Sequence, residues 1–533
     1  MYDVLIVGAG GAGLTASLSA AKSGAKVAIV SKSYPTRAQT SMAQGGINAA
    51  LANNGEDDTQ SHADDTFKSA NSLANRDFID KLCNSAPDAI AWLDSIGVPF
   101  SRTADGKIAQ RRLGGACAAR AAYAQDFTGL KILHTLYDQV LKADIEIINE
   151  HYMLNIDVKD NTVQGISALD IRSTQIRTIR AKSVILATGG YSQLYHGYTT
   201  NSSGTTGDGI AAALRAGANL SNIEFMQFHP TALKNSKILI SESARGAGGY
   251  LLNSKLERFT DELAARDKVA RAILKEIDSG EEVWLDIRHL GEEFIEENLP
   301  QERKLAKLYE HIDPVNELIP IMPIAHYSMG GIEVDENGMS AVNGLFACGE
   351  CSDHKVHGAN RLGGNSLLEL IVFGRESGKN ALTYSKTYKE PIEQTEQLDS
   401  DISLIETIYN SVNEIDFYEK RTQLGKIFYK NAGLFRNENG LKIALESVKQ
   451  IQEELKVMGI EDKSKNYNTN LVEFIEFTNL IELAEILLLG AIERKESRGA
   501  HYRDDYIDKN DAVFATPTIS YKNNGELLFK EYL

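Results

Sequence analysis

The segment from His357 to Arg375, HGANRLGGNSLLELIVFGR, joins an arginine and a glycine-rich turn to a stretch that is apolar over most of its length. The apolar stretch predicts a helix that begins just after the glycines. A helix N-terminus presents free N–H groups and a partial positive charge, so it can hold an anion or an electron-rich carbonyl group. The segment therefore predicts a site where a helix stabilises negative charge on a ligand.

Two other segments must position this site. Residues 344–350, GLFACGE, are typical of an apolar strand that ends in a Gly-Glu turn. Residues 1–13 are typical of a strand, a glycine-rich turn and the start of a helix, which is the order found in dinucleotide-binding units. A dinucleotide-binding pattern at the front and a second cofactor-contacting turn much later predict a flavoenzyme whose binding domain is split by an insertion.

The glycines at the N-terminus follow the pattern Gly8-x-Gly10-x-x-Gly13. The first permits a tight turn, the second lets the backbone approach a pyrophosphate, and the third lets the helix pack closely on the strand. The second strand departs from the usual pattern because it ends in Ser31-Lys32 rather than in an acidic residue. We therefore expect another group to contact the adenosine ribose.

Composition narrows the class of protein. The chain has 533 residues, 43% hydrophobic and 24% charged, which suits a soluble protein of several domains. Its net charge of −17 argues against binding to nucleic acid or to anionic lipid. The 4 cysteines are scattered, which fits a reducing compartment. No stretch approaches the ~18 apolar residues of a membrane span, and the early first strand leaves no room for a signal peptide.

The order of expected elements predicts an α/β fold with a Rossmann-like FAD-binding domain, which is interrupted by an α+β capping domain and followed by a C-terminal helical domain. We expect a linker at about residues 385–400, helices between residues 402 and 494, and a polar, less regular tail. The expected boundaries are 1–221 and 338–390 for the FAD-binding domain, 222–337 for the capping domain, 400–496 for the helical domain and 497–533 for the tail.

Further motifs occur in a specific order and spacing. They are Gly8–Gly13, Pro35–Arg37, Ala43–Gly46, Thr206–Gly209, Gln227–Thr231, Ser241–Arg245, Ala265–Asp267, His326–Gly331, the segment from His357, and Arg494–His501. With these motifs the chain resembles, along nearly its whole length, the flavoprotein subunit of succinate dehydrogenase and fumarate reductase. That subunit belongs to the FAD-dependent oxidoreductase 2 family, which also contains L-aspartate oxidase.

The resemblance implies bound FAD. Glu350 can accept hydrogen bonds from ribityl hydroxyls, and the N–H groups of Ser366 and Leu367 open a helix toward the flavin carbonyl, where they would stabilise the reduced ring. The implied cofactor-binding residues are Gly8, Ala9, Gly10, Gly11, Ala12, Gly13, Ser31, Lys32, Gln39, Thr40, Ala43, Gln44, Gly45, Gly46, Asp208, Glu350, Ser366 and Leu367.

The cofactor is expected to bind without a covalent link. Many relatives attach FAD through a histidine in the sequence Arg-Ser-His-Thr, and the matching segment here is Arg37-Ala-Gln39-Thr40. Glutamine cannot form that bond. A histidyl substituent withdraws electrons from the flavin, so its absence should lower the potential and favour fumarate reduction over succinate oxidation. Alternatively, the surrounding field restores the potential without the link.

The resemblance also implies a C4 dicarboxylate, fumarate or succinate, as the substrate. It assigns substrate binding to His229, Ser241, His326 and Arg361, with no metal ion. Arginine suits this role because its planar guanidinium binds a carboxylate through two parallel hydrogen bonds.

By the same resemblance Arg266 is the proton donor, and Arg245 and Glu242 form a relay in the order Arg245, Glu242, Arg266. An arginine acid is unusual because an isolated guanidinium hardly deprotonates. The role requires neighbouring cations that destabilise its charge and a relay that returns the proton at once. The alternative is an ion-pair network that merely orders the site.

The segment Arg112-Leu-Gly-Gly115 bears on the choice of substrate. Reductase relatives have phenylalanine before the glycines, whereas aspartate oxidases tend to have glutamate. Leu113 is neither, so the site lacks both the carboxylate that an amino-acid substrate would need and an aromatic wall. The main alternative function is an L-aspartate oxidase that forms iminoaspartate. A non-catalytic FAD-binding assembly subunit is a further alternative, against which the retained polar set argues.

The expected partners follow from the redox chemistry. The chain lacks the cysteine spacing of an iron–sulfur cluster, and the pair Cys348 and Cys351 is expected to be coincidental. Electrons are expected to pass through an iron–sulfur subunit and then a membrane quinone-reactive subunit, in the electron transport of the tricarboxylic acid cycle or of anaerobic respiration. An oxidase or a soluble reductase would need neither partner. We expect a cytoplasmic protein held on the cytoplasmic face of the inner membrane through its partners.

Overall fold

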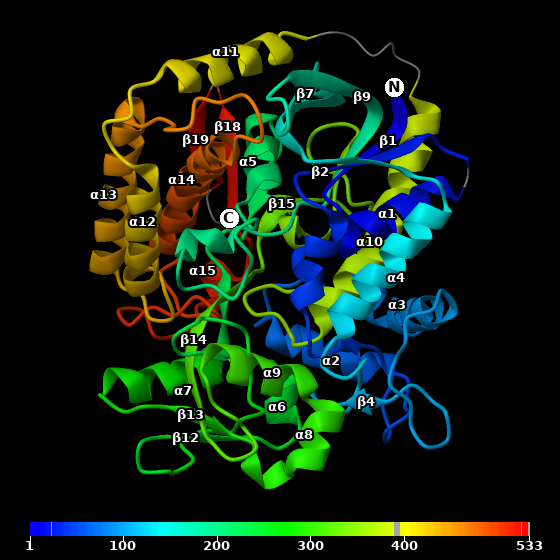
Figure 1. The fold of residues 1–533 in the computed structure, drawn as a ribbon, viewed down its shortest axis with the longest axis vertical. Helices are drawn as coiled ribbons and strands as arrows, with labels where there is room; N and C mark the ends of the chain where they lie inside the picture. The colour runs from blue at the N-terminus through cyan, green and yellow to red at the C-terminus, as the bar shows by residue number, and fades with distance from the viewer. Residues whose placement is uncertain (23, 389–394, 524, 531–533) are drawn as a thin grey trace.

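A seven-stranded sheet forms the centre of the fold (Figure 1). The computed structural model describes residues 1–22, 24–388, 395–523 and 525–530. The strand order is β6-β2-β1-β9-β8-β7, and β16 also pairs with β9. The strands are β1 (Tyr2–Val7), β2 (Val27–Ser31), β6 (Glu146–Asn149), β7 (His151–Lys159), β8 (Thr162–Asp170), β9 (Ile176–Leu186) and β16 (Leu345–Ala347).

The strands β1, β2, β6, β9 and β16 run parallel to one another, whereas β7 and β8 join β9 as an antiparallel extension. A parallel sheet is covered on both faces, which explains why β1 is a continuous apolar run. Val4 and Ile6 pack into one hydrophobic core, and Leu5 and Val7 pack into another on the opposite face.

Helices cover both faces of this sheet. On the Val4 side lie α1 (Gly11–Ala21), α3 (Arg76–Ser95), α4 (Thr128–Lys142) and α10 (Asn365–Thr387). On the Leu5 side lie α5 (Asp208–Arg215) and α14 (Thr469–Glu493). The helix α2 (Thr59–Ser69) and a small sheet of β3 (Ile47–Asn48), β5 (Ala121–Ala122) and β4 (Gln110–Arg111) lie beside the first group. The expected FAD-binding fold is confirmed.

Residues 226–328 form a second unit, the capping segment, drawn in green at the bottom of Figure 1. Its sheet has the order β11-β14-β13-β12 and surrounds a hydrophobic core of its own. The elements are β11 (Met226–Leu233), α6 (Glu242–Gly246), β12 (Tyr250–Leu252), α7 (Arg266–Asp278), β13 (Trp284–Asp286), α8 (Glu292–Asn298), α9 (Pro300–Tyr309) and β14 (Ile319–Ser328).

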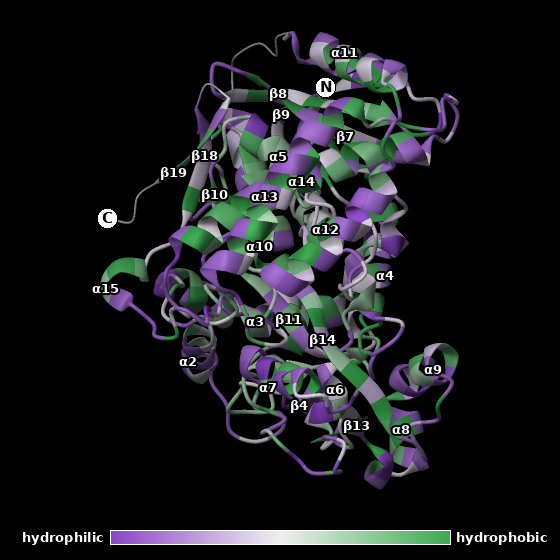
Figure 2. Ribbon diagram, turned by 90° about the vertical axis from the view of Figure 1, so that its left-hand side faces the viewer, coloured by the Kyte–Doolittle hydropathy of each residue, from purple (hydrophilic) through white to green (hydrophobic). Residues whose placement is uncertain are grey.

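The helices expected between residues 402 and 494 are present. They are α11 (Gln397–Asn410), α12 (Phe417–Asn431), α13 (Glu438–Glu454) and α14. The expected linker is shorter than predicted, because α10 continues to Thr387 and α11 already begins at Gln397; its middle, residues 389–394, lies outside the described residues. The helix α11 carries both hydrophilic and hydrophobic residues along its length (Figure 2). Within the described ranges, no helix combines the length and the apolar character of a membrane span.

The tail is more regular than its sequence indicates. After α15 (Asp511–Phe514), the strands β18 (Ile519–Asn523) and β19 (Glu526–Lys530) form a hairpin. The hairpin completes a five-stranded sheet of order β17-β15-β10-β18-β19, with β10 (Leu220–Ser221), β15 (Gly331–Glu333) and β17 (Ser352–Asp353). The prediction of a less regular tail was therefore wrong for these short strands, of which β18 pairs with β10, a segment far away in the chain.

Candidate active site

One cavity brings together nearly all the residues predicted to bind cofactor or substrate. It is lined by the turn between β1 and α1, by residues 31–46, by the start of α10 and by the capping segment. The exceptions are Gly13 and Arg245. Gly13 packs against the glycine turn, and Arg245 lies behind Glu242, as described below.

The three glycines of the first turn differ in their surroundings. Gly8 has a φ of +108°, and a β-carbon there would lie 2.1 Å from the carbonyl oxygen of Ala187. A β-carbon on Gly13 would lie 1.9 Å from the carbonyl oxygen of Gly8. At Gly10 a β-carbon would meet other side chains no closer than 3.6 Å. Gly10 lines the cavity, and its lack of a side chain leaves the space that the predicted pyrophosphate contact requires.

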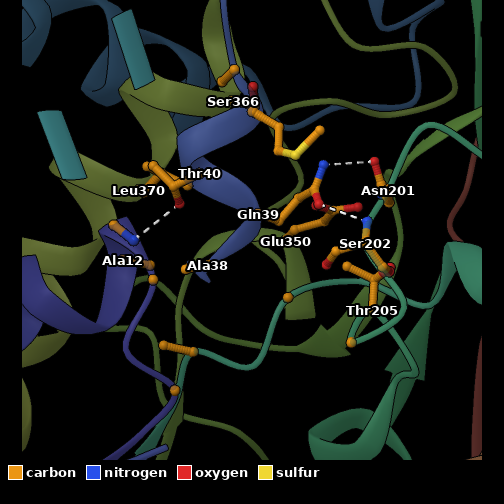
Figure 3. Close-up of a pocket in the computed structure, with 18 of the residues that line it drawn as sticks. Ala12, Ala38, Gln39, Thr40, Asn201, Ser202, Thr205, Glu350, Ser366 and Leu370 are labelled. Atoms are coloured by element: carbon orange, nitrogen blue, oxygen red, sulfur yellow. Dashed lines mark hydrogen bonds between the residues drawn. The ribbon is translucent and has the colours of Figure 1, made fainter. Parts of the chain in front are cut away.

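Two helices begin at this cavity. Gly10 is the N-terminal cap of α1 and has no side chain to occupy the free N–H groups; that of Gly11 donates to Thr40 Oγ1 at 3.1 Å (Figure 3). Gly364, with a φ of +87°, starts α10 in the same way. Ser366 and Leu367 of the first turn of α10 line the cavity. Both N-termini therefore suit negatively charged parts of a ligand, which fits FAD.

A buried ion cluster lies at the end of β2. The ammonium group of Lys32 donates to Asp208 at 2.7 Å and to Glu476 of α14 at 2.6 Å. Burial disfavours the charge of Lys32, but Asp208 and Glu476 outweigh it and raise the pKa of the ammonium group. Of the two carboxylates, Asp208 lines the cavity beside Lys32, near the position from which the usual acidic residue is missing. Glu476 escaped the sequence analysis because no motif surrounds it.

Gln39 takes part in a polar contact across the cavity wall. Its amide nitrogen donates to Asn201 Oδ1 at 3.0 Å, and its amide oxygen accepts the backbone N–H of Ser202 at 2.9 Å (Figure 3). Glu350 lies on another side of the same cavity, where one carboxylate oxygen accepts from the backbone N–H and the hydroxyl of Ser328. Burial raises the pKa of Glu350 to about 7.

The capping segment contributes two histidines from adjacent antiparallel strands. The ring centroids of His229 on β11 and His326 on β14 lie 5.0 Å apart. His326 Nδ1 lies 2.7 Å from the hydroxyl of Thr200, and His229 Nδ1 lies 3.0 Å from the carbonyl oxygen of Thr231. Burial, followed by the charge of Arg266, lowers the pKa of both rings well below the usual value. Both rings are therefore neutral at pH 7, and each has one N–H to donate.

Arg361 is held from several sides just before α10. Its two terminal nitrogens donate to Gln227 Oε1 and to Ser366 Oγ, each at 3.0 Å, and the guanidinium lies 4.1 Å from the centre of the Tyr327 ring. Burial and Arg266 lower the pKa of Arg361 to about 10, which leaves it charged at pH 7. Its Nε is buried without a hydrogen-bond partner among the described residues. An anionic ligand would supply the missing acceptor.

The three predicted catalytic residues form a continuous chain of contacts. Arg266, the first residue of α7, donates from Nε and Nη2 to Glu242 Oε2 at 2.9 and 2.5 Å. Arg245 Nη2 lies 3.7 Å from the other oxygen, Glu242 Oε1. Burial opposes the charge of Glu242, but Arg266 and Arg245 prevail and lower the pKa of its carboxyl group. The order in space is that of the expected relay; the proton-transfer role itself stays a prediction.

The cavity also contains a neutral bridge between its cations. Gln227 Oε1 accepts from Arg361 and, at 3.3 Å, from Arg266 Nη1. Gln227 was not among the predicted site residues, although it precedes His229 by two positions on β11 and therefore shares its face. Three arginines and one glutamate give this end of the cavity a positive charge. A chain with a net charge of −17 can therefore still present a cationic pocket to an anion.

Leu113 and Ser241 flank the space beside Gly45. A β-carbon built on Gly45 would lie 3.7 Å from each of them. Leu113 is 2% exposed and lines the cavity. The Ser241 hydroxyl accepts from the N–H of Ser243 at 3.1 Å and so caps α6, whose first residue is Glu242. Among the described residues, no group of metal-ligating side chains could hold a metal ion.

Comparisons with known proteins agree with this geometry. A family model for an FAD binding domain matches residues 3–367, and one for the C-terminal part of the fumarate reductase flavoprotein matches residues 421–531. The succinate dehydrogenase flavoprotein subunit of Rickettsia bellii is 40% identical, covering 97% of this chain and 92% of the relative. The 8-methylmenaquinol:fumarate reductase flavoprotein subunit of Wolinella succinogenes is 39% identical, covering 98% and 89%. A solved quinol fumarate reductase of E. coli has a TM-score of 0.94 and 35% identity, covering 99% and 96%.

Proposed function

The chain belongs to the family of flavoprotein subunits of succinate dehydrogenase and fumarate reductase, and from this premise we propose that it interconverts fumarate and succinate in the cavity described above. One observation carries the assignment to this chain. Arg361, with its unpartnered Nε, lies beside Arg266 where the capping segment meets the start of α10. A dicarboxylate bound there would have its charges matched and its reacting carbons next to a proton donor.

FAD fits the other part of the cavity. Residues 8–13 would hold its pyrophosphate, Glu350 its ribityl chain, and the N-terminus of α10 would face the flavin carbonyl. Lys32 and Asp208, which line the cavity, would contact the adenosine ribose, and Glu476 would hold Lys32 in place. When bound, FAD supplies the hydride for fumarate reduction or accepts it from succinate.

The side chains of the cavity supply the remaining chemistry. Arg361 binds one carboxylate of the substrate, and the neutral rings of His229 and His326 donate hydrogen bonds to the other. The histidines donate from Nε2, in the tautomers whose Nδ1 accepts from the backbone N–H of Thr231 and from the hydroxyl of Thr200. In fumarate reduction, one alkene carbon gains the hydride and Arg266 protonates the other. Glu242 then returns a proton to Arg266, and Arg245 returns one to Glu242. Hydrogen bonds to the carboxylates also stabilise the negative charge that develops next to them.

We infer that FAD binds without a covalent link, because Gln39 has no nucleophilic atom and both ends of its amide are already in hydrogen bonds. Acid precipitation of the purified protein should release the flavin completely into the supernatant, where its absorbance is measured. A flavoprotein with histidyl-linked FAD serves as the control, because its flavin stays in the pellet. Flavin that precipitates with this chain would contradict the inference.

We further propose that the enzyme favours fumarate reduction, because a flavin that lacks an electron-withdrawing histidyl substituent should have a lower potential. Relatives of this chain include both dehydrogenases and reductases, so the family alone leaves the direction open. Glu350 works in the opposite direction, because burial raises its pKa and its protonated form adds no negative charge that would lower the flavin potential. The ratio of the two initial rates, measured with dyes of low and high potential, tests the preferred direction.

The substrate assignment predicts a specific result in an anaerobic assay with reduced viologen. The FAD-loaded chain should oxidise the dye when fumarate is added, and malonate should block the reaction because it occupies the same cations. Iminoaspartate should be reduced poorly, since Leu113 offers no carboxylate to its nitrogen. If fumarate has no effect while L-aspartate reduces the flavin and O₂ reoxidises it, the chain is an L-aspartate oxidase.

We propose that electrons reach the chain through an iron–sulfur subunit and a membrane quinone-reactive subunit, at the cytoplasmic face of the inner membrane. Two of the relatives are a quinol and an 8-methylmenaquinol:fumarate reductase, whose electron donors are quinols. A pull-down with tagged chain from detergent-solubilised membranes should recover both subunits. Recovery of the chain alone, with full activity toward a soluble electron donor, would contradict the proposal.

A further inference from the structure

The helix α9 of the capping segment is capped by a residue from the FAD-binding part of the chain. Its own N-cap residue, Leu299, provides no side-chain hydrogen bond. Instead, Asp126, from the loop between β5 and α4, accepts the N–H groups of Gln301 at 2.7 Å and Glu302 at 3.0 Å. A carboxylate suits this position because it meets the free N–H groups and the positive end of the helix dipole. The contact therefore fastens the capping segment to the FAD-binding part of the chain.

Glu302 connects the same helix to the catalytic turn. It is the third residue of α9 and is fully buried. Its Oε1 accepts the backbone N–H of Ser241 at 3.0 Å. Ser241 caps α6, whose first residue, Glu242, pairs with Arg266. The start of α9 is thus linked to Arg266, the proposed proton donor, through the contact of Glu302 with Ser241 and that of Glu242 with Arg266.

The carboxyl groups of Asp126 and Glu302 therefore both lie buried at the start of α9, and the hydrogen bonds there do not satisfy all of their oxygens. Asp126 Oδ1 and Glu302 Oε2 are buried and have no hydrogen-bond partner among the described residues. The nearest cation is Arg111 on β4, but its nitrogens donate to the carbonyl oxygens of Gly45, Gln44 and Gln125 rather than to either carboxylate. Two uncompensated negative charges at such a site are unfavourable, and one shared proton removes the conflict.

We propose that Asp126 and Glu302 share a proton and act as a latch that holds the capping segment closed and keeps Ser241 and Glu242 in position for the reaction. The proton would bridge the two oxygens that have no other partner. When it is lost, the two carboxylates repel each other, Asp126 withdraws from α9, and the turn at Ser241 loosens. Asp126 and Glu302 are positioning residues in this proposal, since neither lines the cavity.

The surroundings of the pair determine when it loses its proton. Burial and then Asp126 raise the pKa of Glu302 well above its usual value, and burial raises the pKa of Asp126 to about 6. Arg111 opposes both shifts, and the Tyr123 ring lies 4.3 Å from the Arg111 guanidinium. Arg303, the next residue on α9, forms ion pairs with Asp313, Glu292 and Glu296 and not with the Asp126–Glu302 pair.

The sign of the pH effect follows. A carboxyl group whose pKa is raised in the folded state stabilises it most at low pH, and this contribution is lost as the pH rises through the raised value. The latch should therefore be closed at low pH and should open as the pH rises through the raised pKa of the pair, once the pair has lost its last proton. The pair titrates as a unit, so no single residue carries the transition.

Hydrogen exchange of the FAD-loaded protein tests the latch without reference to the substrate. Protection of peptides that contain Ser241 and Glu302, corrected for intrinsic exchange, should fall about tenfold or more between about pH 6.5 and pH 9.5. In Glu302→Gln and Asp126→Asn it should stay constant, because an amide can donate to the remaining carboxylate at every pH. Glu293→Gln, an exposed change on α8, should behave like the wild type. Equal pH dependence in all four proteins would overturn the latch.

Kinetics provide a second readout, which rests on the proposed function. The KM for fumarate of the wild type should rise over the alkaline range, while the KM of Glu302→Gln should change much less. If no variant reduces fumarate at any pH, the proposed function fails, whereas the exchange result still decides the latch. If fumarate is reduced and the variant keeps the wild-type KM profile, the latch does not control closure and the proposal is wrong.

Discussion

Replacement of Arg266 with lysine should reduce fumarate turnover by on the order of 10³-fold while FAD remains bound, since a positioned general acid contributes about that much. Lysine keeps the positive charge but loses the planar group that contacts Glu242 through two nitrogens and Gln227 through a third. The proton would then have neither the right position nor a relay to replace it. Stopped-flow oxidation of the reduced protein by fumarate measures the loss directly.

A matched control is available on the same helix. Arg271 contacts Asp267 and the backbone of Gly499 outside the cavity, so Arg271→Lys should leave turnover within a fewfold of the wild type. Malonate affinity, followed by the flavin spectrum, should change little in Arg266→Lys because Arg361 still binds a carboxylate. Substantial residual turnover in Arg266→Lys would show that Arg266 is not the acid. Its ion pair with Glu242 would then serve only to order the site.

The second large effect is expected at Arg361, where lysine should raise the KM for fumarate and the Kd for malonate by on the order of 10²-fold. The guanidinium is held by Gln227, Ser366 and the face of Tyr327, and lysine can reproduce at most one of these contacts. Binding of the substrate carboxylate through two parallel hydrogen bonds is lost as well. Titration with malonate, monitored by flavin absorbance, gives the Kd independently of turnover.

The two substitutions should therefore differ in kind. Arg266→Lys lowers kcat with little change in malonate binding, whereas Arg361→Lys weakens malonate binding first. Arg375→Lys serves as the control on α10, because Arg375 pairs with Asp88 on the surface. Unchanged malonate affinity in Arg361→Lys would move carboxylate recognition to other residues and would weaken the substrate assignment.

The sequence was sufficient to predict the parts of the site that lie inside motifs. His229, Ser241 and Arg361 belong to short patterns of specific spacing, and the fold brings all three to one cavity. Gln227 lies in one of those patterns and could have been found from its position on the same face as His229. Its bridging contact could not, because that contact depends on the orientation of α7 relative to the start of α10.

Residues without a motif could not be found in this way. The contact between Lys32 and Glu476 spans 444 residues, and the contacts of Asp126 with α9 span up to 176. Asp126 and Glu476 are both buried, but periodicity cannot distinguish a buried carboxylate from a solvated one. Burial reveals them, and burial is a property of the folded chain.

The same reasoning applies to the fold. Periodic segments such as α13 were predicted correctly, because 3.6-residue periodicity is a local signal; its buried residues recur every three or four positions, at Leu441, Ala444, Val448 and Ile451. The hairpin of β18 and β19 was missed because its strands are short and because β18 pairs with β10, which lies far away in the sequence. Tertiary pairing gave these strands a regularity that their local sequence does not encode.

The contact of Glu476 with Lys32 also sets an order of events during synthesis. The ribosome releases Lys32, which lines the cavity, long before the carboxylate of Glu476 that pairs with it, because the two are 444 residues apart. β16, which pairs with β9, also arrives late. A nascent chain can therefore form separate helices and strands, but not the complete pocket. We expect cofactor insertion to follow release from the ribosome, and truncated chains that end before α14 to be recovered without flavin.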